Sequence, residues 1–312
     1  GHDIGHQDIE RALDAARTVA IPGNRDVIHV IPRGYVVDGL DGVKNPIGMT
    51  GSRLEVETHI VCGGSGTIQN LVKCVERAGV RPSALVLEPL AAATAVLSDS
   101  EREAGVVLVD IGGGTTDVAV FVEGSVWHSA VLAVGGSHIT NDIAIGLRAP
   151  YETAEELKIK HGRASVDGVL SDEPVRLATE GGTQHYRRAE LCEIIEARVE
   201  EIFQLVREEL RASGMLGLLP AGAVLTGGSA QLDSIADVAA RILDMPVRIG
   251  VPGELEGLVD TIASPAFATG VGLVRWGFSH AALGGAVYED TSSPRSNDVY
   301  ARVKGWLKAF LP

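Results

Sequence analysis

The stretch that decides the fold is Asp110-Ile111-Gly112-Gly113-Gly114-Thr115-Thr116-Asp117, which lies between two apolar runs, 106–109 and 118–122. The two runs predict buried strands joined by a glycine-rich hairpin. Glycines lack a Cβ, so backbone N–H groups can approach phosphate oxygens, and the hydroxyls of Thr115 and Thr116 add donors. Asp110, at the end of the first strand, can hold a hydrated Mg²⁺. The octet therefore predicts a nucleotide-phosphate clamp. The alternative is a plain hairpin turn, which needs one or two glycines rather than three.

Composition bounds the remaining possibilities. The chain has 312 residues, 45% of them hydrophobic, which is enough for a large core and two or more domains. A formal charge of −14 argues against nucleic acid as a general partner. The nine histidines show no zinc-ligand spacing. The sequence shows no apolar run long enough to span a bilayer and no signal-peptide pattern at its start, so we expect an intracellular protein.

Hydrophobic periodicity predicts an α/β chain in which strands and helices alternate. The apolar positions Ile9, Ala12, Leu13 and Ala16 indicate the first helix, and Thr67 is the expected N-cap of a later one. Strands are expected at 27–31, 35–37, 54–62, 84–87 and 223–226, and further helices at 67–78, 89–97, 153–160, 188–212, 232–243 and 267–276.

Two more glycine turns follow predicted strands. Gly135 and Gly136 precede a helix whose free N–H groups and dipole can face a phosphate, and Gly227-Gly228-Ser229 resembles that turn. For each turn taken alone, a simple turn with a helix cap explains the residues equally well. Three such elements in one chain favour a shared ligand site.

Three charged residues are further candidates. Glu88, just before Pro89, can orient a water molecule near a γ-phosphate, or it can be an acid favoured by the helix dipole. Glu155 and Lys158 lie three residues apart on one helix and can contact a ribose or adenine. Spacing alone favours a solvated ion pair for these two.

The C-terminal section changes character. Residues 279–298 are typical of a flexible tether, and 299–312 predict a short basic amphipathic helix that lies on an anionic membrane. The alternative is a terminal helix docked on its own domain. One such helix binds lipid weakly, so polymerisation would supply avidity. The predicted membrane-binding residues are Val299, Arg302, Val303, Lys304, Trp306, Leu307, Lys308, Phe310 and Leu311.

Several stretches together resemble the actin/Hsp70 ATPase superfamily and, within it, the family of the bacterial cell-division protein FtsA. The octet matches the superfamily's second phosphate motif, 225–235 its adenosine motif, and 87–93 and 267–273 its two connecting helices. The stretches 31–39 (IPRGYVVDG), 46–57 (PIGMTGSRLEVE) and 153–162 (TAEELKIKHG) are similar to the FtsA family in particular. The resemblance implies an actin-like (ribonuclease H-like) two-lobed ATPase fold with an inserted FtsA-specific α/β subdomain.

The resemblance also implies domain boundaries. The expected units are an inserted subdomain at 1–79 (1C, SHS2-like), the remainder of the first lobe at 80–104 plus 262–278 (1A), the second-lobe core at 105–146 plus 220–261 (2A), its smaller subdomain at 147–219 (2B), a linker at 279–298 and a membrane-targeting helix at 299–312.

For function, the resemblance implies a protein that binds ATP and Mg²⁺ and polymerises into actin-like filaments. It would anchor the FtsZ ring to the cytoplasmic side of the inner membrane at the division septum and recruit later division proteins, with at most a weak ATPase activity. Implied roles are Asp110 for the metal and Glu88 for the catalytic water. Implied cofactor-binding residues are Gly112, Gly113, Gly114, Thr115, Thr116, Gly135, Gly136, Glu155, Lys158, Gly227, Gly228 and Ser229.

One family feature does not occur in these 312 residues: a first phosphate hairpin ahead of the inserted subdomain. We expect the sequence to be a truncated form of a longer polypeptide. Alternatives within the superfamily are a PilM-like protein of type IV pilus assembly and an Hsp70-like or sugar-kinase-like ATPase. The basic terminal helix argues against the first, and the lack of a substrate domain or sugar pocket argues against the second.

Overall fold

A computed structural model describes the chain except for residues 19–22, 171–172, 180–181, 254–261 and 283–312. The predicted membrane helix at 299–312 and most of the predicted tether lie outside the described residues. The first four tether residues, 279–282, are instead the last turn of helix α10 (Ala268–Ala282).

The centre of the molecule is a five-stranded sheet in the order β12-β11-β6-β7-β8. Strand β11 runs parallel to β6 and β12, whereas β7 is antiparallel to both β6 and β8. Because β6 and β8 both lie antiparallel to β7, strands β6, β8 and β11 end at the same edge. The strands are β6 (Val106–Ile111), β7 (Thr116–Val122), β8 (Ser125–Leu132), β11 (Ala223–Thr226) and β12 (Val247–Ile249).

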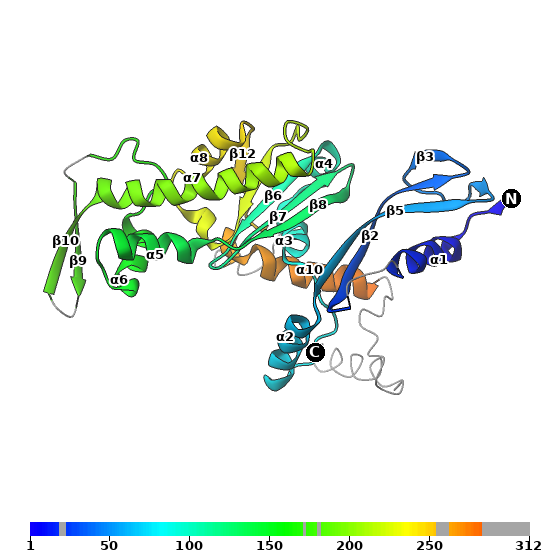
Figure 1. Cartoon of the computed structure of the whole chain (residues 1–312), viewed down its shortest axis with the longest axis horizontal. Helices are drawn as coiled ribbons and strands as arrows, with labels where there is room; N and C mark the ends of the chain where they lie inside the picture. The colour runs from blue at the N-terminus through cyan, green and yellow to red at the C-terminus, as the bar shows by residue number, and fades with distance from the viewer. Residues whose placement is uncertain (19–22, 171–172, 180–181, 254–261, 283–312) are drawn as a thin grey trace, which may run out of the picture.

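Helices cover both faces of this sheet (Figure 1). Alternate residues of β6 enter two separate cores: Val107 and Val109 pack with helices α5 to α8, and Leu108 packs with α3 and the start of α10. Burial on both faces explains why residues 106–109 of β6 form an unbroken apolar run. The helices are α3 (Glu88–Val96), α4 (Asp99–Ala104), α5 (Gly136–Gly146), α6 (Tyr151–His161), α7 (Arg188–Ala212) and α8 (Ile235–Leu243).

At one end of the molecule, an antiparallel hairpin of β9 (Pro174–Thr179) and β10 (Gly182–Arg187) projects beyond α6 and the start of α7 (Figure 1). Helix α7 has the bounds predicted from its sequence. Its apolar residues Leu191, Ile195 and Ile202 are buried.

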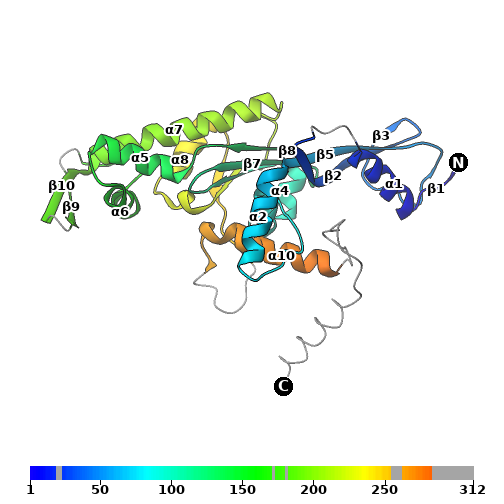
Figure 2. The ribbon, with the colours of Figure 1, turned by 60° about the horizontal axis from the view of Figure 1, so that its bottom comes forward.

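The N-terminal subdomain occupies the other end (Figure 1). Its three-stranded sheet has the order β3-β2-β5, and helix α1 packs against β2 and β5. Helix α2 contacts β5 and β2, the two long strands of this sheet, and Figure 2 shows it from a second side. The elements are β1 (His2–Asp3), α1 (His6–Arg17), β2 (Arg25–Val37), β3 (Leu40–Val43), β4 (Thr50–Gly51), β5 (Leu54–Gly64) and α2 (Ser65–Arg77).

The structure differs from the sequence prediction at four places. The strands expected at 27–31 and 35–37 are one strand, because a register shift next to Pro32 accommodates the missing N–H without ending β2. Helix α2 begins at Ser65, with Gly64 rather than Thr67 at the N-cap. The helix expected at 232–243 begins at Ile235, after the 3₁₀ turn Gly228–Gln231.

The fourth difference concerns residues 84–87, which form no strand. A strand needs a neighbour to pair its backbone groups, and the described part of the chain offers none here. The N–H of Leu87 instead donates to Nε2 of His29 over 3.0 Å. A second short 3₁₀ turn, Pro265–Phe267, leads into α10. No helix among the described residues is long and apolar enough to cross a membrane.

Candidate functional site

The glycine hairpin lies where the pairing of β6 with β7 ends. Asp110 stands opposite Asp117 and Ile111 opposite Thr116, so the connection between the strands is 112–115. The N–H of Gly112 donates to the Thr115 carbonyl over 2.9 Å and closes the turn. Within the described part of the chain, no hydrogen bond engages the N–H groups of Gly113 and Gly114, and both residues are exposed. The predicted hairpin is confirmed, and its tip presents free donors.

The two threonines of the octet are already engaged. The Thr115 hydroxyl donates to Oδ2 of Asp117 over 3.0 Å. Thr116 is fully buried, and its hydroxyl donates to the Val134 carbonyl over 2.8 Å. The Thr116 hydroxyl is therefore not available to a phosphate in this structure; it ties the hairpin to the segment that follows β8.

Two carboxylates sit beneath the hairpin. Asp110 and Asp117 are only 3% and 5% exposed. Burial raises the pKa of Asp110 to about 6; the charge of Asp117 adds to this, and a hydrogen bond from Thr269 opposes it. Burial also raises the pKa of Asp117, against the hydrogen bond from Thr115. The site therefore disfavours negative charge unless a cation is present.

A third carboxylate, Glu88, is the first residue of α3, one residue before the predicted helix start. It interacts electrostatically with Asp117 and Asp110. The residue as a whole is exposed, yet loss of hydration around its carboxyl, followed by the charges of Asp117 and Asp110, raises the pKa of Glu88 to about 7. The negative charges of these three carboxyl groups therefore act on one another.

These acids suit a hydrated divalent cation. None of the ion pairs formed among the described residues involves Asp110, Asp117 or Glu88. The described residues also include no group of three His, Cys, Asp or Glu side chains that would enclose a metal ion. Mg²⁺ usually keeps several waters and takes one or two carboxylates together with substrate phosphates, so the residues present fit it.

The turn before α5 packs against the hairpin. The N–H groups of Gly136 and Ser137 donate to the carbonyls of Gly112 and Gly113 over 2.9 and 2.8 Å, and the Gly135 N–H donates to Nδ1 of His138. The N–H groups that the sequence suggested were free are thus occupied. A Cβ on Gly135 would lie 2.7 Å from the Gly112 carbonyl oxygen, so glycine is needed for this close approach. A phosphate contact by this turn stays a prediction and would require the hairpin and α5 to separate.

Glu155 and Lys158 meet beside the same turn. Nζ of Lys158 donates to Oε2 of Glu155 over 2.7 Å, to the Thr140 hydroxyl over 2.8 Å and to the Gly136 carbonyl over 3.1 Å. Burial raises the pKa of Glu155, but the hydrogen bonds from Lys158 and Thr140 outweigh it and leave the pKa below its usual value. The pair is therefore a partly buried network that ties α6 to the first turn of α5, not a solvated surface pair.

The third glycine turn completes the edge. Gly227 follows β11, whose last residue, Thr226, stands opposite Asp110. Gly227 has a φ of 87°, and a Cβ there would meet Oδ1 of Asp110 and lie 2.5 Å from the Ile111 carbonyl oxygen. The Ser229 hydroxyl donates to the Gly112 carbonyl over 3.3 Å. All three predicted glycine turns thus converge on residues 110–113.

Three residues of the site were not predicted from the sequence. The Thr269 hydroxyl donates to Oδ2 of Asp110 over 3.0 Å, and Asp117 is a buried acid of the site rather than only a turn residue. Thr140 is fully buried and bonds to both Lys158 and Gly136. Thr140 was detectable, because a threonine four residues after a glycine turn can bond back to it. Nothing in the local sequence of Thr269 predicted its partner.

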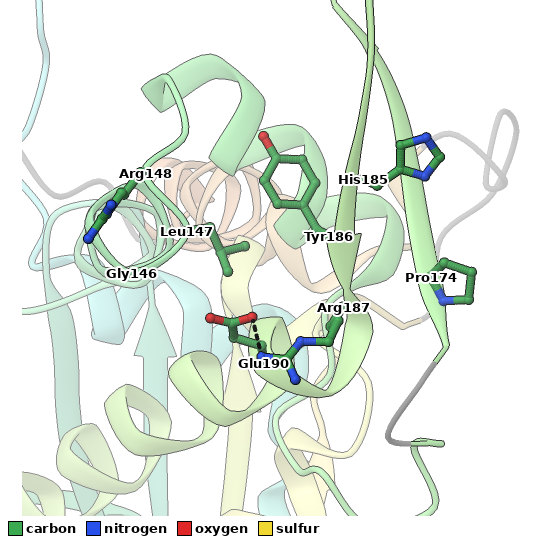
Figure 3. Close-up of a pocket in the computed structure, with 8 residues that line it drawn as sticks. All are labelled: Gly146, Leu147, Arg148, Pro174, His185, Tyr186, Arg187 and Glu190. Carbon is green, nitrogen blue, oxygen red and sulfur yellow. Dashed lines mark hydrogen bonds and ion pairs between the residues drawn. The ribbon is translucent and has the colours of Figure 1, made fainter.

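A separate pocket of about 560 Å³ opens at the far end of α5, next to β10 and the start of α7 (Figure 3). In it Arg187 and Glu190 form an ion pair over 3.2 Å, and Leu147 and Tyr186 supply an apolar wall. None of the predicted site residues in the described part of the chain lines this pocket. It is distinct from the glycine-lined edge.

Comparisons with known proteins agree with this geometry. The family model "Cell division protein FtsA" matches residues 107–272, and the model "SHS2 domain inserted in FTSA" matches residues 1–62. A cell division protein FtsA of Pseudomonas aeruginosa is 42% identical over 312 residues, covering 98% of this chain and 75% of the relative. An Escherichia coli K12 protein of the same name is 36% identical over 315 residues, with the same coverage.

Solved structures support the fold. MreB5 of Spiroplasma citri bound to ADP has a TM-score of 0.58 at 20% sequence identity, and the match covers 72% of this chain and 69% of the MreB5 chain. The PilM-PilN type IV pilus biogenesis complex has a TM-score of 0.62 at 17% sequence identity, and the match covers 89% of this chain and 74% of the matched chain of that complex. At these identities the likeness concerns the fold alone. Together with the relatives, it shows that this chain has an actin-like nucleotide-binding fold with an SHS2 insert and belongs to the FtsA family of cell-division proteins.

Proposed function

We propose that this chain binds ATP with Mg²⁺, polymerises, and anchors the FtsZ ring to the cytoplasmic side of the membrane at the division septum, where it recruits later division proteins. The observation that carries the proposal is the convergence of three glycine turns on two buried acids at one sheet edge, with Glu88 electrostatically coupled to both acids, in a chain 36–42% identical to FtsA proteins over 98% of its length.

In this proposal the nucleotide lies across that edge. The free N–H groups of Gly113 and Gly114 bind phosphate oxygens, and Asp110 binds a hydrated Mg²⁺. Bound Mg²⁺ supplies positive charge that neutralises the phosphates and lowers the cost of ionising the acids. The open position beside Gly228, where a Cβ would meet nothing within 4 Å, leaves room for the nucleoside.

Glu88 would orient the attacking water. Its pKa of about 7 lies near neutral pH, which suits a group that accepts a proton from water. The family resemblance implies at most a weak ATPase activity, as suits a structural protein. A rapid nucleotide turnover that depends on a sugar would favour the kinase-like alternative instead.

The membrane part of the proposal rests on the sequence of 299–312. Anionic vesicle flotation of the full-length protein and of a variant lacking 299–312 tests it directly. We expect the full-length protein to float and the shortened protein to stay in the dense fraction. As a matched control, Trp306→Ala with Phe310→Ala keeps every basic residue but reduces the apolar area, and should also lose binding. Equal flotation of all three proteins would reject the tether.

Partner choice separates this proposal from a pilus role. The solved pilus complex shares only the fold, whereas the FtsA relatives share 36–42% of residues. We expect the protein to bind a peptide with the C-terminal sequence of FtsZ in a fluorescence-anisotropy titration. A scrambled peptide of equal charge is the control. Equal binding of both peptides would contradict the proposed anchoring of FtsZ.

A further inference from the structure

The two oxygens of the Asp110 carboxylate have different surroundings. Oδ2 accepts a hydrogen bond from the Thr269 hydroxyl over 3.0 Å. Oδ1 lies against the backbone of Gly227, where a Cβ would collide with it. No other side-chain or backbone donor reaches this carboxylate within the described part of the chain. The Thr269 hydroxyl therefore fixes how the buried Asp110 carboxylate is rotated.

Thr269 itself has a fixed position. It is the second residue of α10, and Ala268 before it is fully buried. Three residues later, Gly272 packs so closely on the Ala91 carbonyl of α3 that no Cβ fits between them, and the Thr94 hydroxyl donates to the Gly272 carbonyl over 3.1 Å. A β-branched residue has few χ1 rotamers, so the hydroxyl of Thr269 is held by its helix.

Thr269 and Thr94, on two helices that pack together, use their hydroxyls differently. A threonine in the middle of a helix can bond back to a carbonyl of the preceding turn. Thr94 of α3 does so, donating to the carbonyl of Ala91. Thr269 instead donates to a carboxylate 159 residues away along the chain. The bond thus joins α10 to the edge of the central sheet at the acid proposed to face the metal.

We propose that Thr269 is a positioning residue for the Mg²⁺-nucleotide site, which orients the Asp110 carboxylate so that its free lone pairs face the phosphate hairpin. This inference rests on the proposed nucleotide function. Groups that orient a metal-binding side chain typically contribute about tenfold or more to metal affinity.

The test uses the full-length protein and a fluorescent ATP analogue. Nucleotide binding is titrated with Mg²⁺ at fixed nucleotide, and again in EDTA. Thr269→Val keeps the branched shape but removes the donor, and should raise the half-saturating Mg²⁺ concentration about tenfold. Thr269→Ser keeps the donor and should restore it to within about twofold of the original protein. Binding in EDTA should be the same for all proteins.

Thr94→Val is the matched control, because it removes a threonine hydroxyl from the same helix pair without touching Asp110. Its Mg²⁺ requirement should be unchanged. Melting temperatures check that each variant folds. An equal Mg²⁺ requirement in Thr269→Val and the original protein overturns the positioning role, and so does a defect that Thr269→Ser fails to rescue. If the original protein binds no nucleotide at all, the proposed function itself is wrong.

Discussion

Replacing Gly227 with alanine should destabilise the glycine-lined edge more than any other single-methyl change there. Its φ of 87° lies in the left-handed region that a Cβ disfavours. The added Cβ would also meet Oδ1 of Asp110 and lie 2.5 Å from the carbonyl oxygen of Ile111, which belongs to a fully buried strand. Neither neighbour can move without disturbing the pairing of β6 with β11.

The magnitude follows from two contributions. At φ 87° and ψ 168°, Gly227 lies in a backbone region that is essentially restricted to glycine, and holding another residue there costs about 1 to 3 kcal/mol. Overpacking by one methyl group in a tight interior costs about 1 to 3 kcal/mol. The free energy of unfolding should therefore fall by roughly 2 to 6 kcal/mol, which corresponds to a loss of roughly 4 to 12 °C in melting temperature at about 2 °C per kcal/mol.

Gly228→Ala is the matched control, because it adds the same methyl one residue further on, where a Cβ meets nothing within 4 Å. Its melting temperature should stay within about 2 °C of the original. Both variants are measured by thermal denaturation followed by circular dichroism, in EDTA and without nucleotide. Equal melting temperatures for the two variants would refute the close packing of Gly227 against Asp110.

Three further outcomes are expected. Because the pKa of Glu88 is raised from 4.5 to about 7, folding takes up a proton between those values, so this group lowers stability as pH rises through the window. In metal-free protein, Glu88→Gln should therefore raise the melting temperature more at pH 7.5 than at pH 5.5; an equal rise at both would contradict the shift. Arg33 stacks 4.8 Å from the Trp127 ring and donates to its carbonyl, so Arg33→Lys should loosen the N-terminal subdomain from β8 and speed proteolysis between them, whereas an unchanged digestion pattern would argue against this contact. Lys158→Met removes the donor that joins Glu155, Thr140 and Gly136 and should lower stability by about 1 to 3 kcal/mol in urea denaturation; a change below about 0.5 kcal/mol would show that the network adds nothing.

The parts of the fold that local sequence determines were predictable. The octet 110–117 predicted its hairpin because apolar runs of strand length flank a turn that only glycines form easily. Helix α7 was predictable because its apolar positions repeat with helical spacing over 25 residues. The glycine turns at 135–136 and 227–229 were also identified, and they do converge on the hairpin.

Features that depend on distant partners were not predictable. Residues 84–87 have strand-like composition, but a strand exists only beside another, and the sequence does not show whether a neighbour is present. The N–H groups of Gly136 and Ser137 looked free because their acceptors, the carbonyls of 112–113, lie more than 20 residues away in the chain. Thr269 was missed for the same reason: its role comes from Asp110, which only the folded chain brings near.

The central claim is that the edge built from 110–116 and its neighbouring glycine turns binds a nucleotide through Mg²⁺. The most direct measurement is equilibrium binding of labelled ATP to the full-length protein, with Mg²⁺ or with EDTA, for the original sequence and for Asp110→Asn. We predict saturable binding in Mg²⁺ that weakens about tenfold or more in EDTA and in Asp110→Asn. No binding by the original protein, or equal Mg²⁺-dependent binding by Asp110→Asn, would contradict the claim.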